Sequence, residues 1–225
     1  MERPILFNTL MVTAILEGRK TQTRRIVKHP LGFEQVNTVN GPSWRYREFR
    51  KINGTIYETG SGPLDESIDF IKSLCPLGQV GDFLWVRETF RLFDSDECPH
   101  SDFPCGCPRN GTPLFKASHD CGDGEKWTPS IHMPRSASRI LLEITNIRVE
   151  QLNQISRVDA VKEGLHQLPA TGRYVVNKGD QYFGGASSNP CEVFKWLWES
   201  INGSDSWAQN PWVWVVEFKV KEPQQ

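Results

Sequence analysis

Hydrophobic and polar residues alternate along two long segments of this chain, which predicts β-strands there. In residues 139–152 branched apolar side chains alternate with polar ones, and the alternation shifts after Thr145, which indicates a β-bulge. Residues 212–220 alternate in the same way and predict a strong closing strand. Shorter apolar segments predict further strands over 4–8, 24–28 and 83–90.

Apolar residues recur at helical spacing in other segments, and each of these has its own boundary signals. Asn8 is placed to cap a first helix, and Gly18 is placed to end it. Ser156 is placed to cap a second helix. A third helix begins at Pro190, a residue suited to the first helical turn, and ends at Asn202.

Polar, irregular segments separate these elements and predict long insertions into a single domain that spans residues 1–225. The insertions cover about 29–75, 91–129 and 166–188. The first contains Asn53-Gly54 between two strand-like segments, which is a strong hairpin signal. Several strands with helices between them and long insertions favour an α+β fold built on a small closed barrel with flanking helices.

The composition excludes some classes of protein. The net charge is −1, so nucleic-acid binding would need a local basic patch. Residues 1–17 lack the apolar stretch of a signal peptide, and no segment has the length of a membrane span. Six cysteines without a secretion signal favour reduced thiols or a metal over disulfides. We therefore expect a cytoplasmic protein with no membrane partner.

Residues 18–25 contain the densest charge of the chain, with three arginines, one lysine and two threonines. Charges at this density are costly to bury, so the segment is expected to face water or an anionic partner. A solvated basic turn is the structural alternative.

The same segment, Gly18-Arg19-Lys20-Thr21-Gln22-Thr23-Arg24-Arg25, fits the signature G-x-K-x-x-(E/T)-x-R and resembles the ASCH family, a branch of the PUA-like β-barrels. Further segments in the same order resemble ASCH proteins encoded by phages and prophages: 4–8, 81–88, 130–135, 159–164 and 210–214. The resemblance extends from residue 4 to about 220. It implies a small PUA-like β-barrel with long loop insertions.

The signature is also similar to that of bacterial N4-acetylcytidine amidohydrolases, which implies catalytic roles for Lys20, Thr23 and Glu163. A threonine hydroxyl becomes a nucleophile when a neighbour takes its proton. A lysine can do so if desolvation and nearby cations lower its pKa, and a glutamate can relay protons to the leaving amine or hold the second-step water. In the structural alternative, Lys20 binds phosphate, Thr23 satisfies a turn and Glu163 pairs with Arg25.

Basic and aromatic side chains favour recognition of RNA or a modified nucleoside by the same cleft, with guanidinium groups on phosphate and rings on bases. The candidate ligand-binding residues are Arg24, Arg25, Lys28, Trp85, His132 and Arg135. A ribonuclease, a non-catalytic RNA-binding module and a phage accessory or morphogenetic protein are the alternatives to an amidohydrolase. The chemistry requires no cofactor, and no obligate protein partner is evident.

The insertion over 91–129 contains four cysteines: Cys98, Cys105, Cys107 and Cys121. Four thiolates can close a tetrahedral zinc site, and a loop this poor in apolar residues needs something to order it. The spacing lacks the usual pair of C-x-x-C motifs, so free cysteines are the alternative. Structural zinc is thus the cofactor that the sequence suggests.

Overall fold

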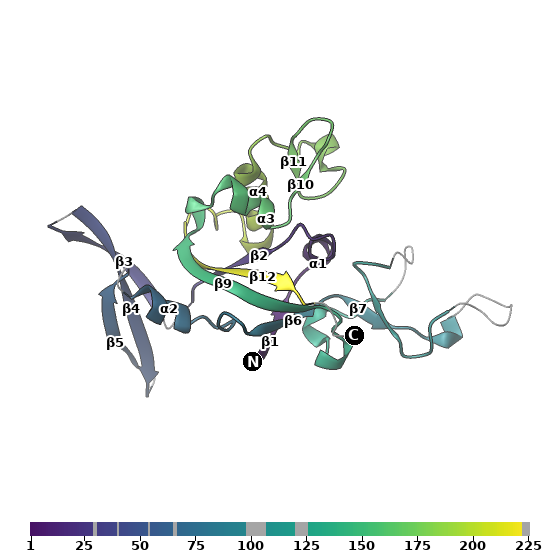
Figure 1. Ribbon diagram of the computed structural model, residues 1–225, viewed down its shortest axis with the longest axis horizontal. Helices are drawn as coiled ribbons and strands as arrows, with labels where there is room; N and C mark the ends of the chain where they lie inside the picture. The colour runs from purple at the N-terminus through teal and green to yellow at the C-terminus, as the bar shows by residue number, and fades with distance from the viewer. Residues whose placement is uncertain are drawn as a thin grey trace.

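A five-stranded mixed sheet forms the centre of this α+β protein (Figure 1). This computed structural model describes residues 1–28, 31–39, 41–53, 55–64, 67–97, 107–119 and 126–221. The strands of the sheet are β1 (Glu2–Leu6), β6 (Phe83–Arg87), β9 (Leu141–Gln151), β12 (Trp212–Val220) and β2 (Gln22–Ile26), in that spatial order. β1 and β6 are parallel, and the other neighbours are antiparallel.

The sheet is open over the described residues, whereas the sequence predicted a closed barrel. β1 and β2 are its two edges, and no ladder between described residues joins them. The chain connects these edges through helix α1 (Thr9–Leu16), and Arg25 Nη2 donates a hydrogen bond to the Leu6 carbonyl at 2.7 Å. The Arg25 side chain thus links the two edges. The predicted α+β class is confirmed.

The helices begin at the capping residues that the sequence indicated. The Asn8 side chain accepts a hydrogen bond from the first turn of α1, and Gly18 follows the helix with a φ of +73°. Ser156 caps α3 (Arg157–Lys162) in the same way. Pro190 is the first residue of α4 (Pro190–Asn202). In the part of the chain that the structure describes, no helix has both the length and the apolar character needed to span a membrane.

β12 is buried on both of its faces, because a hydrophobic core lies on each side of the sheet. Trp214, Val216 and Phe218 join the core that contains residues of α1. Val213 and Val215 join the core that contains residues of α4. β12 therefore contributes side chains to both hydrophobic cores.

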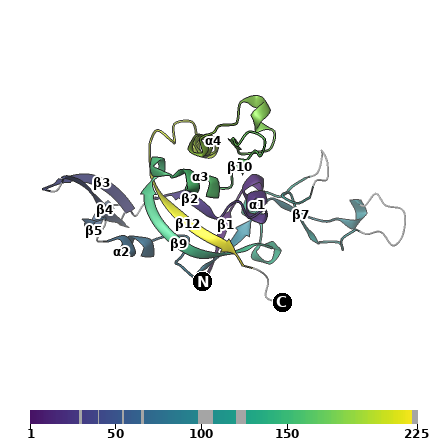
Figure 2. The ribbon, with the colours of Figure 1, turned by 45° about the horizontal axis from the view of Figure 1, so that its top comes forward.

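The first insertion forms a separate antiparallel sheet that projects to one side of the central sheet in both ribbon views (Figures 1 and 2). Its elements are β3 (Leu31–Thr38), β4 (Gly41–Ile52) and β5 (Thr55–Pro63), followed by helix α2 (Ile68–Ser73). The predicted hairpin around Asn53 is the β4–β5 pair, and β3 was not predicted. Aromatic contacts attach this sheet, since Trp212 of β12 stacks on Phe33 at 4.5 Å and meets the edge of Trp44 at 5.0 Å.

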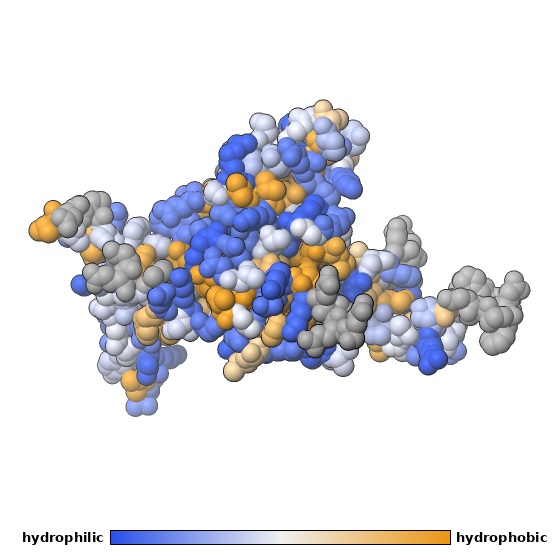
Figure 3. Space-filling view, in the orientation of Figure 1, coloured by the Kyte–Doolittle hydropathy of each residue, from blue (hydrophilic) through white to orange (hydrophobic). Residues whose placement is uncertain are grey.

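The other two insertions contribute short pairs of antiparallel strands. β7 (Phe90–Leu92) pairs with β8 (Pro113–Phe115), and β10 (His166–Gln167) pairs with β11 (Tyr174–Val175). The predicted strand over 83–90 is thus divided between β6 and β7. On the face seen in Figure 3, hydrophilic residues cover much of the surface and hydrophobic residues form separate patches.

Candidate functional site

Glu163 holds two buried cations at the centre of the site. Lys20 Nζ lies 2.7 Å from Glu163 Oε2, and Arg24 Nη1 lies 2.8 Å from Glu163 Oε1. The side chains of Lys20 and Arg24 are 0% exposed and that of Glu163 is 3% exposed. Two residues of the predicted catalytic trio, Lys20 and Glu163, therefore form one ion pair. Arg24, predicted to bind ligand, directs its guanidinium to carboxylates instead.

Backbone geometry brings these side chains together. Lys20 and Glu163 form an isolated antiparallel β-bridge. Gly164 follows with a φ of +109°, and a Cβ at this position would lie 2.8 Å from the Cβ of Ala14. Glycine is therefore required where the end of α3 passes α1. This close approach places the Glu163 carboxylate beside the residues that follow α1.

A layer of acidic and basic side chains continues behind Arg24. Arg24 Nη2 lies 2.5 Å from Glu150 Oε1 and 3.7 Å from Asp159 Oδ2. Arg148 binds the same two carboxylates, at 3.1 Å from Glu150 and 3.0 Å from Asp159. Alternating charges of this kind offset the cost of burying each one. Arg24 is therefore held rigidly as part of the scaffold.

Burial changes the ionisation of Lys20. Desolvation lowers the pKa of its ammonium group below the ordinary value, and attraction to Glu163 opposes that shift. Arg25 and Arg24 lower the pKa of Lys20 further through charge repulsion. Lys20 is thus nearer to losing its proton than an exposed lysine, which a general base requires.

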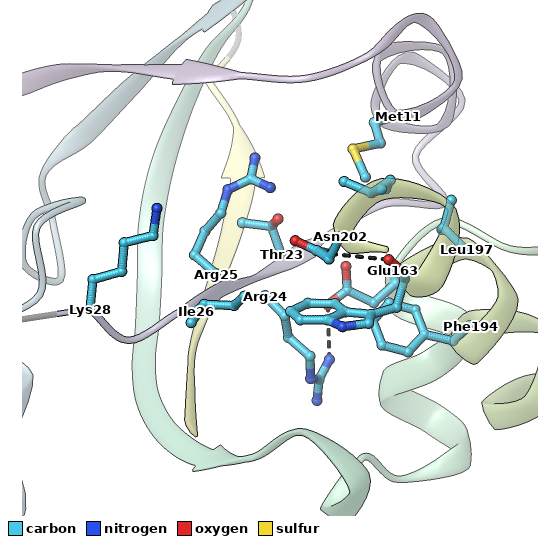
Figure 4. A pocket seen from close by; sticks show the side chains of 12 residues that line it. Met11, Thr23, Arg24, Arg25, Ile26, Lys28, Glu163, Phe194, Leu197 and Asn202 are labelled. Carbon is cyan, nitrogen blue, oxygen red and sulfur yellow. Dashed lines mark hydrogen bonds and ion pairs between the residues drawn. The ribbon is translucent and has the colours of Figure 1, made fainter. Parts of the chain in front are cut away.

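A pocket of about 200 Å³ lies between α1, β2 and α4 (Figure 4). Thr23, Arg25 and Lys28 supply polar groups to its lining, and Met11 and Leu197 supply apolar ones. Figure 4 shows that the side chains of Thr23, Arg25 and Lys28 project to one side of β2, whereas that of Arg24 projects to the other. Thr23, Arg24 and Arg25 alternate as expected of a strand, and Lys28 lies beyond the end of β2 at Ile26.

Thr23 lines this pocket with a hydroxyl that has no hydrogen-bond partner among the described residues, although the residue is only 1% exposed. Glu163 also lines the pocket, and Lys20 lies behind Glu163, outside the lining. The structure therefore brings the predicted trio together, with Thr23 and Glu163 in front and Lys20 enclosed.

Three predicted ligand-binding residues lie away from this pocket. Trp85 of β6 lies beneath Arg87 and Arg135, whose guanidinium carbons are 5.6 and 5.9 Å from the ring centroid. Arg135 also pairs with Glu2 at 2.9 Å. His132 is exposed in the 3₁₀ turn that precedes Arg135. These residues form a second group and do not line the pocket.

The predicted zinc site is largely outside the described residues. Cys98, Cys105 and Cys121 lie in the undescribed segments, and Cys107 is half-buried. Elsewhere, across the described ranges, no group of three or more His, Cys, Asp or Glu residues is arranged to hold a metal. The zinc hypothesis therefore stays a prediction from the cysteine pattern.

The contribution of α4 to the pocket was not predicted from the sequence. The apolar stripe of this helix predicts a core face, and Phe194 and Trp198 are indeed buried. Both also line the pocket, together with Leu197, Ile201 and Asn202. No pattern in the sequence distinguishes a core residue from one at the rim of a pocket, so no signal was missed.

No protein-family model, curated protein or solved structure matches this chain.

Proposed function

We propose that the pocket binds a nucleoside and that the protein hydrolyses an N-acylated cytidine, as an ASCH-type protein related to the PUA-like folds. The observation that carries this proposal is the position of the Thr23 hydroxyl. It lines the pocket without a described hydrogen-bond partner, next to Glu163 and in front of the buried Lys20. A nucleophile with neighbouring titratable groups at a cavity is the arrangement expected of an acyl-transfer site.

The pocket lining supports recognition of a nucleobase. Met11 and Leu197 offer apolar contacts, and Asn202 offers an amide at the rim. Arg25 and Lys28 add donors for oxygen atoms of the ligand. A largely apolar pocket with a few convergent polar groups is typical of small-molecule sites.

The proposed reaction has two steps. In the first, Thr23 Oγ1 bonds to the acyl carbon, and its proton passes by way of Glu163, which lines the pocket with Thr23, to the neutral amine of Lys20 behind it. That proton is then delivered to the exocyclic nitrogen of cytosine as the C–N bond breaks, which releases cytidine and leaves an acyl ester on Thr23. In the second, water attacks the ester, releases the carboxylic acid and restores the hydroxyl. Glu163 holds Lys20 in place through both steps.

Release of cytidine from N4-acetylcytidine by the purified protein tests this proposal. Thr23→Val keeps the shape of the side chain and removes the nucleophile, so we expect it to abolish release without changing the thermal unfolding temperature. Thr21→Val is the matched control, because Thr21 lies two residues away with an exposed side chain. Wild-type protein that folds and releases no cytidine would contradict hydrolysis of this substrate, as would full activity in Thr23→Val.

Non-catalytic binding of single-stranded RNA is the second candidate. It is favoured by Arg25 and Lys28, because neither forms an ion pair with a carboxylate among the described residues, yet both line the pocket. Cations left available in this way attract phosphate. Binding of cytidine-containing RNA without turnover would favour this candidate.

A further inference from the structure

A second hollow lies beside the pocket and shares Arg25 with it. It has a volume of about 380 Å³ and is lined by Pro4, Ile5, Leu6, Arg25, Leu77 and Arg87. Its walls come from β1 and the end of β6, together with Arg25 of β2. The hollow therefore spans the open side of the sheet, where the edge strands β1 and β2 come closest through Arg25 and Leu6.

Both arginines of this hollow have neutral partners. Arg25 Nη2 donates to the Leu6 carbonyl at 2.7 Å. Arg87 Nη2 donates to the Ile131 carbonyl, and its guanidinium lies over the Trp85 ring. The Nε of Arg87 is buried without a hydrogen-bond partner. No carboxylate of a described residue lies within ion-pair distance of either guanidinium.

Two other arginines with buried or partly buried side chains, Arg24 and Arg139, are neutralised by carboxylates. Arg24 meets Glu163 and Glu150, as described above. Arg139 forms a bidentate pair with the buried Glu88, at 2.9 and 3.0 Å. Arg25 and Arg87 differ from these two arginines, because no carboxylate among the described residues lies within ion-pair distance of them.

An unneutralised guanidinium that has lost part of its hydration is costly. The cost is visible at Arg25, whose pKa is lowered by burial even though Glu163 attracts its charge. An anion between two guanidinium groups would remove this cost, and phosphate matches their planar donor geometry. Leu6 and Pro4 leave the entrance open, since Leu6 is 42% exposed.

We propose that this hollow binds the phosphate of a nucleotide whose base occupies the pocket, so that the ligand is a phosphorylated nucleoside. The inference rests on the proposed function, because it assumes a nucleoside in the pocket. Arg25 lines both the pocket and the hollow, whereas Arg87 lines only the hollow. The phosphate can belong to a mononucleotide or to an RNA strand.

Calorimetric titration with cytidine and with its 5′- and 3′-monophosphates tests this inference. We expect the wild type to bind one monophosphate at least about tenfold more tightly than cytidine. Arg87→Gln removes the charge and keeps a donor for the Ile131 carbonyl. We expect it to lose that preference while its affinity for cytidine stays within about twofold. Arg50→Gln is the matched control, because Arg50 has a 68% exposed side chain on β4.

Equal affinities of the wild type for cytidine and both monophosphates would overturn the inference. An unchanged preference in Arg87→Gln would overturn it as well. Thermal unfolding establishes that each variant is folded, and Arg87→Lys provides a second variant, in which the retained charge should preserve part of the preference.

Two further probes complete the test. One distinguishes an RNA phosphodiester from a mononucleotide phosphate, and the other distinguishes failure of this inference from failure of the proposed function. With oligocytidylate, Arg87→Gln should reduce the slope of log K against log salt by about 0.7 if an RNA phosphodiester occupies the hollow. An unchanged slope together with a lost monophosphate preference would identify a mononucleotide. Inorganic phosphate needs no nucleoside pocket, so phosphate binding that Arg87→Gln abolishes would support the hollow even if cytidine does not bind.

Discussion

Glu163→Gln should destabilise this protein more than any surface substitution, because it removes one carboxylate from between two buried cations. Among the described residues, Glu163 supplies the one carboxylate that meets Lys20, at 2.7 Å. Glutamine preserves the size of the side chain and removes its charge. Lys20, whose side chain is fully buried, would then lack a counter-charge.

The size of the expected loss in unfolding free energy follows from the burial of the Lys20–Glu163 pair. Removing one partner of a buried ion pair costs about 3–5 kcal/mol, because the other charge is left desolvated. Arg24 keeps Glu150 at 2.5 Å, so most of the loss arises at Lys20. We therefore expect the free energy of unfolding of Glu163→Gln to fall by about 3–5 kcal/mol near neutral pH.

The loss of unfolding free energy in Glu163→Gln, here called the deficit, should depend on pH. The reason is that Lys20 is no longer a buried unpaired charge once it loses its proton. Burial lowers the pKa of folded Lys20, and loss of Glu163 lowers it further. In the unfolded chain the pKa returns to about 10.4. Between these two values the unfolded state binds more protons, so stability rises with pH by about 1.4 kcal/mol per unit. The wild type gains stability in the same way but from a higher folded-state pKa, because Glu163 raises the pKa of its Lys20. The deficit of Glu163→Gln should therefore shrink as the pH rises from the folded-state pKa of the variant to that of the wild type.

Urea unfolding followed by tryptophan fluorescence at about pH 7 and about pH 9 measures both effects. Glu143→Gln is the matched control, since Glu143 pairs with Lys219 at 3.3 Å and that lysine is 62% exposed. An exposed pair of this kind contributes less than about 1 kcal/mol. Equal losses in the two variants, or a Glu163→Gln deficit that is the same at both pH values, would refute the reasoning.

Two further predictions concern the backbone and the attached sheet. Gly164→Ala should cost about 2 kcal/mol or more, because its Cβ would lie 2.8 Å from Ala14 in addition to the strain of a φ of +109°. Gly203→Ala, with a φ of +98° and no atom within 4 Å of the new Cβ, should cost about 1 kcal/mol, and equal thermal shifts would contradict the close approach. Trp44→Ala removes the edge contact with Trp212 at 5.0 Å, so limited trypsin proteolysis should cleave within 41–63 faster while the remainder of the chain stays resistant. Unchanged cleavage there would contradict aromatic attachment of the sheet.

Local signals in the sequence predicted the elements whose boundaries depend on a few neighbouring residues. Asn8 and Ser156 cap helices as expected. The predicted bulge after Thr145 is confirmed, since Glu217 pairs with Asn146 and Phe218 pairs with Ile144, which leaves Thr145 as the extra residue. Capping and alternation are local properties, so one sequence suffices to predict them.

The sequence could not predict which residues meet across the sheet. The sequence predicted a strand from residue 24 onwards. It did not indicate which cation Glu163 would meet, and Arg25 was one candidate. β2 instead begins at Gln22, and its alternation directs Arg24 to Glu163. Which residues of a strand face each side of a sheet can be assigned only when the neighbouring strands are known.

The predicted cleft was also divided for a topological reason. Trp85 lies on β6, which pairs with β1 and β9, whereas Thr23 lies on β2, which pairs with β12. The order of strands in a sheet depends on long-range pairing, and the sequence contains no local signal for it. Thr23, Arg25, Lys28 and Glu163 nevertheless line one pocket, as the basic segment and Glu163 together suggested.

The pairing of β2 has a consequence for biosynthesis. Within the described sheet, β2 is bonded to β12 alone, and β12 follows all the other strands along the chain. A chain emerging from the ribosome therefore exposes the strand of Thr23 long before its partner exists. Until residues 212–220 leave the exit tunnel, the basic segment has no sheet to join, so ligand cannot assist the early stages of folding. The pocket should form in one late step that also closes the two hydrophobic cores.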